Sequence, residues 1–165
     1  MKRLTNYILT LFFLTASAVL AADPFEHGWR LDPDTSAIRF ISIKKGSIAE
    51  SSRFDAFSGE ISEKGNVKIN IALDSVDTSI DLRNVRMRFL FFETFTYPEA
   101  VVTATLAPDQ LSDLAAVRRK LLDVPVTLSL RGIESAIPFF PYLDSPSAKC
   151  SPVETVHPII LRLED

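Results

Sequence analysis

The stretch Val67–Val76 reads VKINIALDSV, and its side chains alternate in character. From Val67 to Leu73 every second position carries a large apolar side chain, and lysine, asparagine and alanine fall between. Because successive side chains of a strand point to opposite faces of a sheet, this period of two predicts a half-buried β-strand. One wet face is typical of an antiparallel sheet. The apolar face of this strand comprises Val67, Ile69, Ile71 and Leu73.

The same alternation recurs in VPVTLSLRG, residues 124–132, where Val124, Val126, Leu128 and Leu130 share one face and Gly132 turns the chain. Many short strands with few helices favour a sandwich or a barrel, so we expect a mainly β fold. Further strands are predicted between turn-rich pieces at Trp29–Leu31, Ala37–Lys44, Arg53–Ile61, Ala100–Leu106, Ser135–Phe140 and Val156–Leu163.

Two segments follow a helical period instead. In LRNVRMRFLFF, residues 82–92, the side chains of Leu82, Val85, Phe89 and Phe92 are spaced to share one face. The segment PDQLSDLAAVRRKLL, residues 108–122, has a similar spacing and begins with a proline suited to a first helical turn. We predict two short amphipathic helices that lay their apolar faces on the sheet.

The N-terminus has the layout of a secretory signal peptide. Lys2 and Arg3 precede an apolar run that ends in small residues, and the run is short for a membrane span. We predict cleavage after residue 21, one domain over residues 22–165, and a periplasmic or secreted location. Cleavage removes two positive charges and changes the formal net charge from −3 to −5, which argues against a nucleic-acid partner.

Motifs for catalysis and metal binding are missing from the sequence. His27 and His157 stand far apart, Cys150 is the single cysteine, and there is no HExxH, CxxC, G-x-S-x-G or phosphate-loop pattern. We therefore expect no catalytic residue, no metal and no cofactor. If the protein is an enzyme after all, the available titratable candidates are His157, Asp77 and Glu93.

The stretch RMRFLFFETFTYPEA, residues 86–100, concentrates aromatic side chains beside arginines. Aromatic residues dominate cores and ligand pockets alike, so the sequence leaves both interpretations open. Arg83, Arg86 and Arg88 fit either a solvated helix face or the recognition of an acidic head group at a cavity mouth.

Five motifs in order resemble the YceI-like family of secreted bacterial proteins. They are GWRLDPDTSAIRF, SRFDAFSGEI, VKINIALDSVDTS, LRNVRMRFLFFETFTYPEA and VPVTLSLRG, and they run from about Trp29 to Gly132. The resemblance implies an extended, lipocalin-like antiparallel β-barrel that holds a polyisoprenoid or an isoprenoid quinone. Family members normally continue with further strands after a segment like HPIILRLED, so we expect that the closing strands are missing. An open edge of this kind is consistent with a truncated product, a fragment or a barrel closed in a homodimer.

Carried over by position, the resemblance also implies an apolar lining. Arg83, Arg86 and Arg88 would then meet the ligand's head group. The lining residues would be Phe40, Phe54, Phe57, Ile69, Ile71, Leu73, Phe89, Phe92, Phe95, Val126, Leu128 and Leu130.

Three functions compete at this level. The first is a carrier of a long-chain isoprenoid lipid or quinone that makes transient contact with an inner-membrane protein. The second is an envelope enzyme that acts on a lipid or quinone in the same cavity, and the third is a non-catalytic module that binds a protein partner. The resemblance favours the carrier.

Overall fold

The computed structural model describes residues 23–44, 48–144 and 153–155. The strands of this part pair in an antiparallel manner throughout, which confirms the mainly β, antiparallel prediction. They are β1 (Trp29–Arg30), β2 (Ile38–Lys44), β3 (Ile48–Phe54), β4 (Phe57–Ile61), β5 (Asn66–Ala72), β6 (Val76–Asp77), β7 (Glu99–Thr105), β8 (Arg119–Leu121), β9 (Val124–Leu130), β10 (Ile133–Phe139), β11 (Pro141–Asp144) and β12 (Val153–Thr155).

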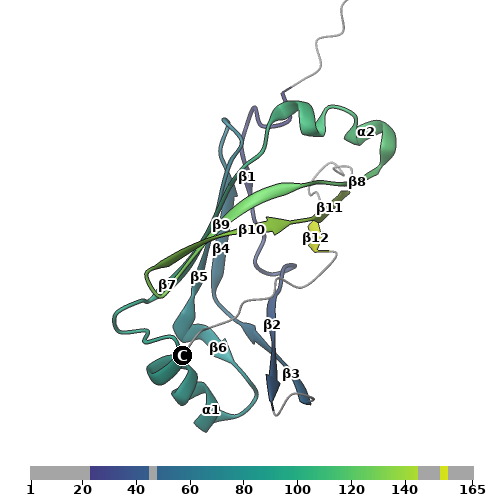
Figure 1. Ribbon diagram of the computed structural model, residues 1–165. Helices are drawn as coiled ribbons and strands as arrows, with labels where there is room; N and C mark the ends of the chain where they lie inside the picture. The colour runs from purple at the N-terminus through teal and green to yellow at the C-terminus, as the bar shows by residue number, and fades with distance from the viewer. Residues whose placement is uncertain (1–22, 45–47, 145–152, 156–165) are drawn as a thin grey trace, which may run out of the picture.

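A six-stranded sheet runs along the length of the molecule in the order β1-β4-β5-β7-β9-β10 (Figure 1). The strand predicted from VKINIALDSV is β5, and it lies near the middle of this sheet. It ends at Ala72, because Leu73–Ser75 forms a 3-10 turn that carries the chain into β6 of another sheet. The buried Ile71 and the exposed Lys68 occupy the opposite faces that the alternation predicts.

Two three-stranded sheets face the two ends of the long sheet. The sheet β2-β3-β6 lies at the lower end in Figure 1, and the sheet β12-β11-β8 lies at the upper end, beside helix α2 (Leu114–Val117). Within the described residues the three sheets are not joined into a closed ring, so the barrel stays a prediction.

Each end has its own cluster of buried apolar side chains. The upper core contains Phe25, Leu106, Leu111, Leu114, Leu122, Val124, Val126 and Leu143. The lower core contains Phe54, Ile71, Leu73, Val76, Phe92 and Ala100. Burial of this apolar surface, at about 25 cal/mol per Å², supplies the main stabilising term.

The prediction of one helix over residues 108–122 is wrong. A 3-10 turn over Pro108–Leu111 and the short helix α2 replace it, and residues 119–121 form strand β8 instead. The helix ends at Arg118, whose φ of 65° lies in the left-handed region. The chain then gains hydrogen bonds from β11, and the Arg119 guanidinium lies 4.4 Å from the centre of the Tyr142 ring.

The predicted helix over residues 82–92 forms, but its orientation was predicted wrongly. Helix α1 (Asp81–Arg86) continues into a π-helical turn, Met87–Phe91, and only Phe92 of the predicted inner face is buried. The other three members, Leu82, Val85 and Phe89, face solvent. The wider π turn adds a residue to the helical period, so Phe92 is not aligned with the stripe before it.

The predicted strand Arg53–Ile61 is also divided. Strand β3 ends at Phe54 and β4 begins at Phe57, because the chain crosses from the small lower sheet to the long sheet at Asp55 and Ala56. The Ser75 hydroxyl accepts a hydrogen bond from the Ala56 N–H, at 3.0 Å, and holds this crossing. The predicted strand Val156–Leu163 and the predicted signal peptide lie outside the described residues. Among the described helices, none is long and apolar enough to cross a bilayer.

Candidate functional site

Most of the predicted lining residues converge on the lower core. Of the remainder, Val126 belongs to the upper core, and Phe89 and Phe95 lie outside both cores, where their rings stack 5.1 Å apart. The converging residues come from both sheets and the helical segment, and they are Phe40, Phe54, Phe57, Ile69, Ile71, Leu73, Phe92, Leu128 and Leu130.

Phe92 is the centre of an aromatic cluster inside the lower core. Its ring centre lies 5.7 Å from that of Phe54, 6.5 Å from that of Phe40 and 4.9 Å from that of Phe91. The tilted and edge-on arrangements are those that aromatic rings prefer. Phe92 therefore fastens the helical segment to the small sheet β2-β3-β6.

A row of apolar residues crosses the inner face of the long sheet between the two cores. Ile69 on β5 pairs with Val102 on β7, and Val102 pairs with Leu128 on β9. All three side chains point inward yet stay half-buried, whereas Ile71 below the row and Val126 above it are buried. Ile69 and Leu128 pack at the margin of the lower core and Val102 packs at the margin of the upper core, so the three residues form a partly exposed apolar wall between the cores. We call Ile69, Val102 and Leu128 the midline wall.

Gly59 extends the row onto β4, where it pairs with Ile69. A Cβ atom at this position would lie 3.2 Å from Leu31 and 3.3 Å from Ile69. A larger residue here would crowd Leu31, which packs directly against the strand. Leu31 and Gly59 belong to the first two of the five family motifs, and this contact joins them.

The sequence reasoning missed Val102 as part of this wall. Its strand, β7, was predicted, but the alternation of Ala100, Val102 and Ala104 was not carried over to the lining. That alternation was the signal that could have placed Val102 on the inner face.

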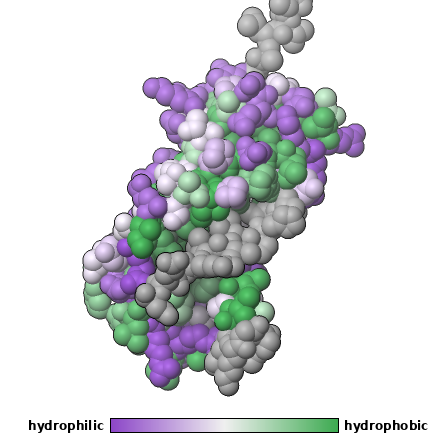
Figure 2. Space-filling view, viewed as in Figure 1, coloured by the Kyte–Doolittle hydropathy of each residue, from purple (hydrophilic) through white to green (hydrophobic). Residues whose placement is uncertain are grey.

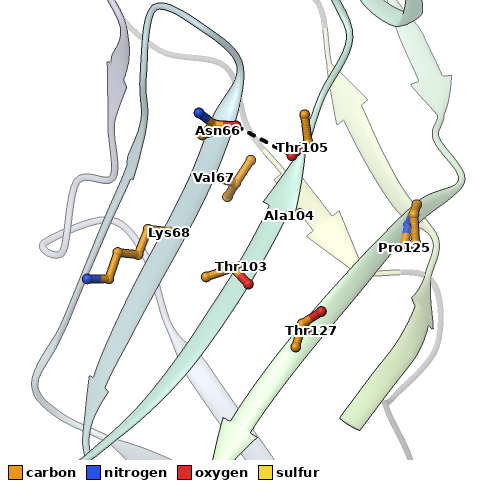
Figure 3. A pocket seen from close by; sticks show the side chains of 8 residues that line it. All are labelled: Asn66, Val67, Lys68, Thr103, Ala104, Thr105, Pro125 and Thr127. Carbon is orange, nitrogen blue, oxygen red and sulfur yellow. Dashed lines mark hydrogen bonds between the residues drawn. The ribbon is translucent and has the colours of Figure 1, made fainter. Parts of the chain in front are cut away.

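The outer face of the long sheet is polar. Figure 3 shows an open groove there, in which the Thr105 hydroxyl donates a hydrogen bond to Asn66 Oδ1 at 3.5 Å. The lining residues of this groove include no acid, histidine or cysteine. The threonine hydroxyls and the Lys68 amine of this groove have no such group beside them to activate them, and the polar surface agrees with the wet face that the alternation predicts. The lining residues are Asn66, Val67, Lys68, Thr103, Ala104, Thr105, Pro125 and Thr127.

The three arginines of the helical segment have different surroundings. Arg83 forms a two-pronged ion pair with Glu50 of β3, at 2.9 and 3.1 Å. Arg86 is exposed, and Arg88 lines a second open groove with its Nε buried and without a hydrogen-bond partner among the described residues. The ion pair of Arg83 therefore joins the helical segment to the β2–β3 hairpin. Arg86 and Arg88 remain the candidates for contact with a head group.

The described candidates for acid or base chemistry are held in ion pairs. Glu93 pairs with Arg131, and Asp77 pairs with Arg53 at 2.7 Å. The hydrogen bond from the Ser79 N–H to Asp77, and after it the positive charge of Arg53, lower the pKa of Asp77 against the opposing effect of burial. His157 lies outside the described residues. Within the described residues, no group of three or more metal-ligating side chains is found.

Asp77→Asn is expected to lower stability in a pH-dependent way. A carboxyl group whose pKa falls on folding contributes stability that is fully present above its unfolded pKa of about 3.9. That contribution is lost as the pH falls through the lowered folded pKa. Urea unfolding of wild type and variant from pH 6 to pH 2 should therefore show a difference that shrinks at the acid end. A constant difference would mean that the charge of Asp77 does not stabilise the fold.

Comparison with known proteins places this architecture. The sequence profile of the YceI-like domain matches residues 29–140. The chain belongs to the YceI-like family. No match was found among curated proteins.

Two solved structures are similar to this YceI-like chain. The first is a polyisoprenoid binding domain from Saccharophagus degradans implicated in plant cell wall breakdown. It is 38% identical, with a TM-score of 0.70, and the match covers 79% of this chain and 75% of that one. The second, BcnA of Burkholderia cenocepacia, is 18% identical, with a TM-score of 0.55 over 71% of this chain and 73% of that one, and it shows the fold alone.

Proposed function

We propose that this YceI-like protein binds and carries a long-chain isoprenoid lipid, such as a polyisoprenoid or an isoprenoid quinone, in the periplasm or outside the cell. The observation that carries the proposal is the midline wall, a half-buried apolar row between two buried cores. The likeness to a polyisoprenoid binding domain supports the choice of ligand. No catalytic step and no cofactor are part of the proposal.

The physical basis of affinity is apolar burial. An isoprenoid chain laid against Ile69, Val102 and Leu128 removes apolar surface of both molecules from water, at about 25 cal/mol per Å². These side chains form no hydrogen bonds with a ligand, so selectivity depends on the shape and length of the isoprenoid chain. Asp77 and Glu93, the described candidates for acid or base chemistry, each form an ion pair with an arginine, which gives both carboxylates a structural role.

Native mass spectrometry of the mature protein, purified from a bacterial periplasm, tests the proposal. We expect a monomer that begins near residue 22 and carries a removable mass that fragments as an isoprenoid. Protein without bound mass is then incubated with a polyprenyl lipid or a quinone to measure the affinity for each. A protein that stays bare in both experiments would contradict the proposed function.

A further inference from the structure

The helical segment Asp81–Phe91 exposes the apolar stripe that the sequence led us to expect inside. Leu82 is 61% exposed, Val85 44% and Phe89 45%, at the i, i+3, i+7 spacing of one helix face. Leu90 and Phe95 beside the stripe are 75% and 89% exposed. An exposed apolar patch of this kind indicates a site of contact with another molecule or with a membrane.

Contacts on the opposite, inner face of the segment fix the orientation in which the apolar stripe faces solvent. Asn84 Oδ1 accepts hydrogen bonds from the Thr78 backbone N–H, at 2.8 Å, and from the Thr78 hydroxyl, at 2.7 Å. Met87 packs against the lower core. The segment therefore turns a polar side chain inward and keeps its apolar stripe outward, and rotating the stripe inward would break these contacts.

The β2–β3 hairpin adjoins the segment through one of its faces and carries exposed apolar residues on the other. The ion pair between Arg83 and Glu50 joins the two elements, and both lie at the lower end of the molecule (Figure 1). On the hairpin, Ile41 is 58% and Ile43 70% exposed, but both alternate with Ser42, the partner of Glu50, and so lie on the face turned away from the segment. Figure 2 shows apolar and polar side chains side by side at this end. We call Leu82, Val85, Phe89, Leu90 and Phe95 the apolar end surface.

The helical segment itself is positively charged, although the whole chain is acidic and Asp74 and Glu99 line the groove beside Phe89 and Phe95. Residues 81–91 contain three arginines and a single acid, Asp81, while the chain as a whole has a formal charge of −3. Arg83 is neutralised by Glu50, but Arg86 is exposed one helical turn from Leu82 and Leu90, with no ion pair among the described residues. An exposed apolar stripe flanked by arginine is the pattern of a helix that lies in a membrane interface.

We propose that the apolar end surface docks on an anionic lipid bilayer. Leu82, Phe89 and Leu90 would enter the boundary between head groups and acyl chains, and Arg86 would lie among the phosphates. The inference rests on the proposed function, since a carrier of an isoprenoid lipid takes up and releases its ligand at a bilayer.

Vesicle flotation of the mature protein tests the docking surface. We expect binding to vesicles that contain phosphatidylglycerol to exceed binding to pure phosphatidylcholine vesicles about tenfold at low salt, and to fall as salt is added. Leu90→Glu and Arg86→Glu should each reduce binding to the anionic vesicles about tenfold. The matched control is Val117→Glu, because Val117 is 49% exposed on α2 at the other end of the molecule and should leave binding unchanged.

Several results would overturn the proposal. These are the absence of binding to anionic vesicles, equal binding of all variants, or a Leu90→Glu variant that changes only the oligomeric state. Native mass spectrometry of the same proteins separates this inference from the proposed function. Leu90→Glu should keep its bound lipid while losing vesicle binding, whereas a wild type that never holds lipid would refute the carrier, whatever the vesicles show.

Discussion

Val102→Asp is expected to reduce the lipid bound per protein by at least about tenfold, which is a loss of about 1.4 kcal/mol or more in binding free energy. In the free protein, the new carboxylate on this half-buried wall keeps part of its hydration. An apolar chain laid against it would remove that water without offering a hydrogen bond. An uncompensated polar group of this kind costs about 2–7 kcal/mol, and an ionised group costs more.

Thr103→Asp is the matched control for this experiment. Thr103 is the next residue of β7, and it is exposed on the opposite, outer face of the sheet across from Lys68. Both variants introduce aspartate into the same strand, so the effect of strand propensity cancels between them. Bound lipid is measured by native mass spectrometry after equal purification, with circular dichroism to verify folding. Equal lipid content in the two variants would remove the midline wall from the proposed site.

Phe92→Ala is expected to lower the free energy of unfolding by about 3–5 kcal/mol, a large fraction of the 5–15 kcal/mol typical of a domain. The Phe92 side chain is 5% exposed and contacts three other phenylalanine rings. Truncation removes these contacts and leaves a cavity between the helical segment and the small lower sheet. Denaturant unfolding of lipid-free protein measures the effect, because bound lipid would itself stabilise the native state.

Phe95→Ala provides the comparison, since Phe95 is 89% exposed and has the same chemistry three residues away. Its substitution should change the unfolding free energy by about 0.5 kcal/mol or less. The midpoint should shift for Phe92→Ala with an unchanged dependence on denaturant. A Phe92→Ala variant as stable as Phe95→Ala would show that the aromatic cluster does not hold the lower core together.

Much of the candidate site was predictable because it lies on regular strands. Ile69, Ile71, Leu128 and Leu130 follow a strict alternation, and a strand sends such residues to one face wherever it is placed. The family resemblance added Phe40, Phe54 and Phe57, which the structure brings to the same core. That these residues are lining residues for a ligand stays a prediction.

The sequence by itself determined the antiparallel strands, their two faces and the family, since each follows from local alternation or ordered motifs. Only the tertiary structure decided that the wall between the cores stays half-buried and that the stripe of Leu82, Val85 and Phe89 faces solvent. It also decided that residues 119–121 form a strand. Local periodicity states which side chains share a face. What covers that face depends on contacts outside the element itself. Thr78 binds Asn84 and so orients the helical segment, and β11 pairs with β8.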